Sequence, residues 1–236
     1  MIISKDQRIV LMGPTKTGTR TSKSVLLPYG IFLEEHVDYV RIIYNCIQKV
    51  PNFDFLKIEK YYVFWRDPVE RFISGCNHFR SPAYIKFLIR FNPQWFTGID
   101  LSPYSNGLPF TPTTPTESKS ILDPLSEIPQ SVINSCLEFA PQITPEQIFN
   151  DNQLMTNNTV MQRQQRWHNN IPTDKLFVLE FSNFEENFRK VAVEFGAPSN
   201  IEIPKLNESN KITTSISSEL EASIREYYAE DYSLKP

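Results

Sequence analysis

The chain has 236 residues, of which 40% are hydrophobic and 22% are charged, a composition typical of a folded globular protein rather than a disordered one. Its 24 basic and 27 acidic residues give a net charge of −3, which argues against a broad nucleic-acid-binding surface. Isolated cysteines, the absence of a signal-peptide pattern and the lack of an apolar run of about 20 residues predict a reduced, cytoplasmic protein without a membrane span.

The first predicted element is an apolar strand at Ile9–Met12, which runs directly into a turn that contains glycine and lysine. Gly18 lets the backbone approach an anion closely, and the amide groups after it open a predicted helix over residues 19–27. The helix dipole favours negative charge at that end, where Thr19, Thr21 and Ser22 add hydroxyl donors. This segment therefore predicts a phosphate-binding turn.

The spacing of Gly13 and Gly18 fits the phosphate-binding loop of nucleotide kinases, but the next two residues do not. Thr19 and Arg20 stand where that loop requires a lysine and then a Mg²⁺-binding serine or threonine. The lysine of this chain lies inside the turn instead, at Lys16. A nucleotide kinase is thus an alternative function, but this chain lacks the metal-binding hydroxyl that such an enzyme needs.

A second polar motif follows the next long strand. The helix at residues 19–27 ends before Pro28, residues 31–33 predict a short strand, and apolar residues at helical spacing predict a helix over residues 37–50. An aromatic strand at residues 61–65 then ends in Arg66, and Pro68 opens a helix that carries Ser74. The planar guanidinium group of Arg66 matches phosphate oxygens, and Ser74 can offer a hydroxyl to the same anion.

A proline-rich segment interrupts this alternation. Half of the chain's 18 prolines lie between residues 92 and 145. Proline removes backbone donors, so we expect a long ordered loop or lid there, with one helix at about residues 131–139. The loop is either a substrate gate or a passive surface insertion.

The remaining elements complete an α/β pattern. Residues 176–179 predict a strand, and a capping box at residues 182–185 opens a helix that ends at Gly196, with a core face made of Phe184, Phe188, Val191 and Phe195. Ser218 opens a last helix in the same way, with Leu220, Ile224 and Tyr227 on one face. Alternating strands and helices predict a single α/β domain over residues 1–236, with a central parallel sheet and ligands at the carboxyl ends of its strands.

The two polar motifs resemble the paired signature of sulfotransferases that use 3′-phosphoadenosine-5′-phosphosulfate (PAPS). The first reads Pro14-x-Lys16-x-Gly18-Thr19, and the second reads Arg66-x-Pro68-x-x-Arg71-x-x-Ser74. Residues 206–211 and 228–232 also resemble stretches of the carbohydrate branch, notably the uronyl 2-O-sulfotransferases. The chain departs from that pattern in residues 151–165, where the family's His- and Pro-Gln-containing stretch is not recognisable, and in the proline-rich segment.

The resemblance implies transfer of a sulfuryl group from PAPS to a hydroxyl group of an acceptor, a saccharide or a small alcohol. The product of the donor is adenosine 3′,5′-bisphosphate (PAP), and no metal is required. The resemblance places the 5′-phosphosulfate on the first motif, and Arg66 and Ser74 on the 3′-phosphate, with Lys211 as a further candidate for that phosphate. The residues of the first motif that would bind the donor are Lys16, Thr17, Gly18, Thr19, Arg20 and Thr21.

The chemistry of sulfuryl transfer assigns further roles. A cation must lie near the leaving oxygen, and Lys16 is the candidate. A base must accept the acceptor's proton, and His36 is the first candidate because it follows a predicted strand and, by the resemblance, stands where that branch has its base. Glu35 or Glu34 is the alternative. An inactive module that binds a nucleotide or a partner also stays open; no nucleic-acid or membrane partner is expected, and the sequence does not indicate an oligomeric state.

Overall fold

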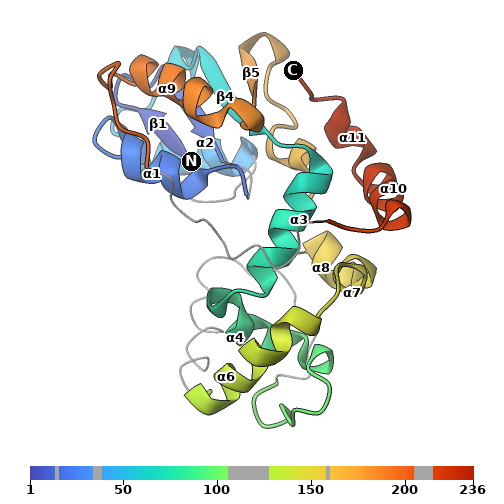
Figure 1. The fold of residues 1–236 in the computed structure, drawn as a ribbon. Helices are drawn as coiled ribbons and strands as arrows, with labels where there is room; N and C mark the ends of the chain where they lie inside the picture. The colour runs from blue at the N-terminus through green and yellow to red at the C-terminus, as the bar shows by residue number, and fades with distance from the viewer. Residues whose placement is uncertain (14–15, 34–38, 106–127, 158–159, 205–214) are drawn as a thin grey trace. The chain divides into compact units, whose positions relative to one another are not determined.

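The computed structural model describes residues 1–13, 16–33, 39–105, 128–157, 160–204 and 215–236 (Figure 1). Two compact units account for them. The first contains residues 1–71, 163–208 and 225–236, and the second contains residues 72–162 and 209–224. The organisation of residues 1–236 as a single domain stays a prediction, and each unit is described by itself.

The first unit contains a five-stranded sheet of order β3-β1-β2-β4-β5. β2 pairs in parallel with β4, and β4 pairs in parallel with β5. β1 is antiparallel to both β2 and β3. The strands are β1 (Ile2–Ser4), β2 (Ile9–Met12), β3 (Gly30–Phe32), β4 (Lys60–Trp65) and β5 (Leu176–Glu180).

The predicted α/β class is confirmed, but the sheet is mixed rather than wholly parallel because of β1. This strand was not predicted, because two isoleucines give too short an apolar run to show a period. β1 and β2 form a hairpin in which Ser4 Oγ accepts a hydrogen bond from the Ile9 backbone N–H (3.0 Å) and donates one to the Asp6 carboxylate (2.5 Å). Gln7 takes a left-handed conformation (φ 66°) in the turn.

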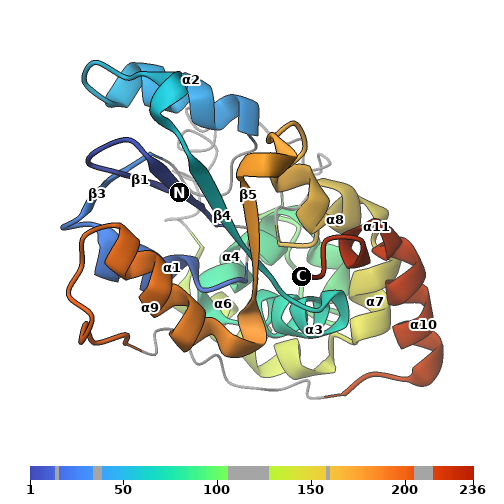
Figure 2. The ribbon, with the colours of Figure 1, turned by 90° about the horizontal axis from the view of Figure 1, so that it is seen from above.

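Helices cover both faces of this sheet (Figure 2). α2 (Tyr39–Lys49) lies on one face and packs against alternate strand residues such as Val10 and Val63. α1 (Thr19–Leu26) and α9 (Phe184–Glu194) cover the opposite face, against Leu11 and Phe64. The alternation of side chains along each strand thus divides the core into two layers. α11 (Ala229–Tyr232) is also part of this unit.

The helices of this unit begin and end close to the expected residues, with one correction. The capping box predicted at Ser182 is wrong, because residues 181–183 form a short 3₁₀ helix and α9 begins only at Phe184. Ser182 donates instead to the Glu180 carboxylate (3.2 Å). The predicted end is confirmed, since Gly196 takes the left-handed conformation (φ +94°) typical of the residue after a helix.

The described part of the second unit is helical. The predicted helix in the proline-rich segment is confirmed as α6 (Gln130–Phe139), whereas residues 106–127 of that segment lie outside the described residues. α10 is capped one residue earlier than expected, because the Leu220 N–H donates to Ser217 Oγ (3.2 Å). Its other helices are α3 (Pro68–Phe79, whose first residues belong to the first unit), α4 (Pro82–Phe91), α7 (Pro145–Asn150), α8 (Asn152–Asn157) and most of α10 (Ser218–Tyr227).

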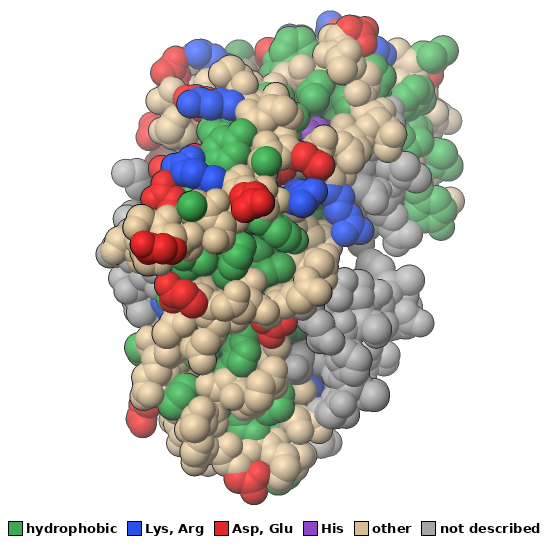
Figure 3. Space-filling model, turned by 90° about the vertical axis from the view of Figure 1, so that its right-hand side faces the viewer, with side chains coloured by type: hydrophobic (Ala, Val, Ile, Leu, Met, Phe, Trp, Pro, Cys, Tyr) green, Lys and Arg blue, Asp and Glu red, His purple; other side chains and the backbone are tan. Residues whose placement is uncertain are grey.

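Acidic and basic side chains are interspersed on the face that Figure 3 shows. None of the described helices is both long and apolar enough to cross a membrane.

Candidate anion-binding site

The turn between β2 and α1 has an unusual backbone. Lys16 takes a left-handed conformation (φ 65°), and Gly18, the residue before α1, does so as well (φ 79°). For a lysine this conformation costs roughly 1–2 kcal/mol, so the surrounding structure has to hold it. The turn places the first amide groups of α1 at an end of the helix where they have no acceptor within the helix.

Gly18 also has no space for a side chain. A Cβ atom built on Gly18 would lie 2.5 Å from Cε2 of Phe184. The Phe184 ring itself is held by Phe64, Phe181 and Phe188, with ring centroids 4.9, 5.2 and 5.2 Å away. The turn therefore rests on an aromatic cluster, defined as Phe64, Phe181, Phe184 and Phe188, that cannot shift without loss of packing.

We expect Gly18→Ala to lower the free energy of unfolding by about 2–4 kcal/mol, because the alanine is strained in both conformation and space. Gly196→Ala is the matched control: its φ is also positive (+94°), but no atom lies within 4 Å of the added Cβ. The control should cost only about 1–2 kcal/mol. Urea unfolding of both variants measures the difference, and equal losses would contradict the tight contact with Phe184.

Cationic side chains converge on this turn. Arg66, at the end of β4, donates from Nη1 to the backbone oxygen of Lys16 (3.2 Å), which links the two sequence motifs directly. Its guanidinium lies over the Phe181 ring, with Cζ 5.0 Å from the centroid. Burial, followed by the positive charges of Arg66 and Arg20, lowers the pKa of Lys16 to about 8. Lys16, Arg20 and Arg66 are called the cation cluster below.

Only a weak ion pair offsets the charge of Arg66 within the part of the chain that the structure describes. The Glu70 carboxylate lies 3.7 Å from Arg66 Nε, too far for a hydrogen bond, and Glu70 is 66% exposed. Arg66 Nε has no hydrogen-bond partner among the described residues, and burial lowers the pKa of this guanidinium. An anion bound here would therefore offset the desolvation of Arg66 and its repulsion with Lys16.

The structure brings Lys16 of the first motif together with Arg66, and it describes some but not all of the other predicted residues. Thr17 is buried, and Thr21 is buried with its hydroxyl donating to the Pro204 backbone oxygen (3.3 Å), so that hydroxyl already has an acceptor. Ser74 is half-buried on α3, within the second unit. The predicted residues that lie outside the described ranges are Glu34, Glu35, His36 and Lys211.

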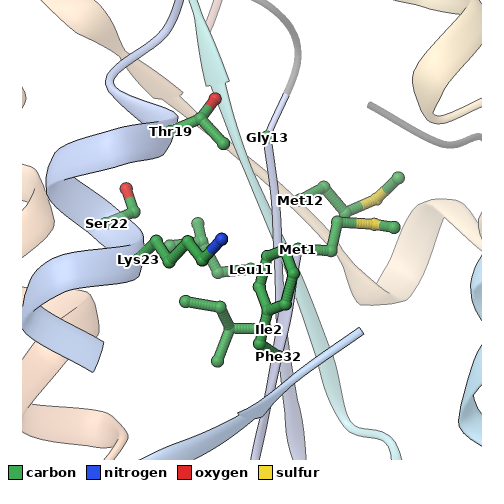
Figure 4. Close-up of a pocket in the computed structure, with 9 residues that line it drawn as sticks. All are labelled: Met1, Ile2, Leu11, Met12, Gly13, Thr19, Ser22, Lys23 and Phe32. Carbon is green, nitrogen blue, oxygen red and sulfur yellow. The ribbon is translucent and has the colours of Figure 1, made fainter. Parts of the chain in front are cut away.

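A small pocket adjoins the turn at Thr19 (Figure 4). The Lys23 ammonium points from α1 over the Phe32 ring, with Nζ 4.0 Å from the centroid, and the walls are otherwise mostly apolar. The lining residues are Met1, Ile2, Leu11, Met12, Gly13, Thr19, Ser22, Lys23 and Phe32.

His168 is the one described histidine of the first unit, and it is poorly suited to act as a base. It is buried, and burial lowers its pKa to about 4. Its imidazole is therefore neutral at pH 7 but too weakly basic to take a proton efficiently.

Comparison of the chain with protein-family models, with curated proteins and with solved structures finds no match. The sulfotransferase resemblance therefore rests on the sequence motifs alone.

The residues that support Arg66 were not predicted from the sequence. Phe181 lies beneath the guanidinium, and Gln164 binds the Arg66 backbone. Phe181 follows β5 directly, so its place at the carboxyl edge of a parallel strand was a usable signal. Gln164 offered none, because it lies in a short 3₁₀ helix (Gln164–Trp167) that is 98 residues from Arg66 in the chain.

Proposed function

We propose that the protein is a sulfotransferase that transfers the sulfuryl group of PAPS to a hydroxyl group of an acceptor. The observation that carries the proposal is the cation cluster, in which Arg66 donates to the backbone of Lys16 and the charges of Arg66 and Arg20 help to lower the pKa of Lys16. PAPS presents the matching chemistry, with a phosphosulfate at one end of its ribose and a phosphate at the other. The motif order and the absence of a Walker lysine favour PAPS over ATP.

In the proposed reaction, the acceptor oxygen attacks sulfur in line with the bond to the 5′-phosphate. The new O–S bond forms as the old S–O bond breaks, and the electron pair stays on the phosphate oxygen of PAP. Lys16 stabilises the charge that develops on this oxygen, and the amide groups at the start of α1 surround the non-bridging oxygens. The proton of the acceptor passes to the base, which we propose is His36, with Glu35 as the alternative.

The acceptor is either a saccharide or a small alcohol. A panel of phenols, aliphatic alcohols and saccharides, tested with radiolabelled PAPS, separates the two classes. Tight binding of PAP without transfer to any acceptor would favour the inactive module.

We expect PAP to raise the melting temperature more than ATP with Mg²⁺ does. A ligand at 100 times its dissociation constant adds about 2.7 kcal/mol of stability, which corresponds to roughly 5–10 °C for a protein of this size. Thermal-shift measurements with PAP, with ATP and Mg²⁺, and without ligand provide the test. A larger shift with ATP and Mg²⁺ would favour the kinase, and no shift with PAP would contradict the donor site.

A further inference from the structure

The side chain of Gln164 forms hydrogen bonds with both peptide groups of Arg66. The Arg66 backbone N–H donates to Gln164 Oε1 (3.0 Å), and Gln164 Nε2 donates to the Arg66 backbone oxygen (2.7 Å). Gln164 is 1% exposed, so water does not compete for these hydrogen bonds. The pair continues the hydrogen bonding of β4 beyond its last residue, at the place where Arg66 leaves the sheet.

Gln164 is in turn held by the carboxyl-terminal segment. The backbone N–H groups of Gln164 and Gln165 donate to the two carboxylate oxygens of Asp231 (2.8 and 3.0 Å). Asp231 is fully buried, and its charge faces Arg71, whose Nη2 lies 3.5 Å from Oδ2. The Asp231 backbone oxygen accepts a hydrogen bond from Trp65 Nε1 (2.7 Å), next to Arg66 in the sequence.

Such a buried ion pair is a poor way to gain stability alone. Desolvation of Asp231 and Arg71 offsets most of their attraction, so well-packed apolar residues would serve the fold as well. What this arrangement does provide is a fixed position for the backbone of Arg66. Asp231 fixes the backbone of Gln164, and Gln164 fixes the backbone of Arg66 immediately before the guanidinium group that meets the turn at Lys16.

We propose that Gln164 and Asp231 are positioning residues for Arg66, which hold its guanidinium group where it grips the 3′-phosphate of the donor. The inference rests on the proposed function, because it takes that phosphate as the ligand of Arg66. Neither residue touches the donor in this scheme. They act through the peptide groups of Arg66, as the supporting shell of a binding site does.

The test measures how much the 3′-phosphate adds to affinity, as the ratio of the dissociation constants of adenosine 5′-monophosphate and PAP. We expect Gln164→Met, which keeps the side-chain length and removes both hydrogen bonds, to lower this ratio about tenfold. Gln165→Met is the matched control, because the Gln165 backbone bond to Asp231 survives the change. It should leave the ratio within about twofold.

Two further variants separate the possible outcomes. Arg66→Ala should lower the ratio, and adding Gln164→Met to it should lower the ratio no further if Gln164 acts through Arg66. An unchanged ratio in Gln164→Met beside a reduced one in Arg66→Ala overturns the positioning role alone. An unchanged ratio in Arg66→Ala overturns both this role and the 3′-phosphate assignment.

Asp231→Asn, which changes the shape of the side chain very little, tests the positioning role in a second way. It keeps one acceptor oxygen and removes the charge that faces Arg71, so we expect the ratio to fall in the same direction. A lower melting temperature with an unchanged ratio in this folded variant would assign Asp231 to stability alone and overturn its positioning role.

Discussion

Replacement of Lys16 by methionine is expected to lower turnover about 10²–10³-fold, the usual loss when one group that stabilises a developing negative charge is removed. The same change should raise the free energy of unfolding. Lys16 is half-buried beside Arg66 and Arg20, which together with burial lower its pKa to about 8. Methionine keeps the length of the side chain and removes this repulsion, so the variant should be more stable by about 1–3 kcal/mol at pH 7.

The sign of the stability effect follows from proton binding. Above pH 8 the folded protein releases the Lys16 proton, whereas the unfolded chain keeps it up to the ordinary lysine pKa of 10.5. Because the unfolded state binds more protons in this window, the stability contributed by this group rises with pH between about 8 and 10.5. The advantage of Lys16→Met should therefore be largest below pH 8 and should disappear at the upper end of the window.

Urea unfolding at pH 7 and pH 10 measures this advantage, and a PAPS turnover assay measures the loss of activity. Lys57→Met is the control, because Lys57 is exposed and its replacement should change stability by less than about 0.5 kcal/mol. Parental turnover in Lys16→Met would remove the catalytic role. A variant that is less stable than the parent at pH 7 would contradict the repulsion within the cation cluster.

The local parts of the site could be predicted from the sequence, and the long-range parts could not. Apolar runs that end at a glycine, a proline or a cation predict β2, the start of α1, β4 and the position of Arg66. The conformation of Lys16 did not follow, because a positive φ at a lysine is imposed by its surroundings. The contact of Gly18 with Phe184 joins elements that lie far apart in the chain, and no local pattern marks it.

The same reasoning explains the errors at element ends. A capping box at Ser182 satisfies the local pattern as well as the 3₁₀ helix does, and the packing of Phe181 and Phe184 around the turn favours the helix start at Phe184. Likewise, Gln164 and Asp231 show their importance only when the carboxyl-terminal segment lies against β4. Sequence motifs thus predicted the groups that we propose to bind the donor, and the fold shows which residues contact Arg66.

His36→Ala is expected to fold and bind PAP normally and to lose about 10²–10⁴ in turnover, the usual contribution of a positioned general base. The base must be neutral to take the acceptor's proton, and an unperturbed imidazole titrates near pH ~6.5. Activity of the parental enzyme should therefore fall as the pH is lowered through that value. A glutamate base would hold activity to about pH 4–5.

The proposed roles of His36 as base and Lys16 as cation together predict how activity depends on pH. In kcat/KM, which reports the free enzyme, His36 sets the acidic limb, and Lys16, with its pKa lowered to about 8, sets the alkaline limb. The profile should be a narrow bell. His36→Ala should abolish the acidic limb and keep the alkaline one, whereas Lys16→Met should do the reverse. Near-parental turnover in His36→Ala with a collapse in Glu35→Gln would transfer the base to the carboxylate, and parental turnover in both variants would leave the proposed reaction without a base.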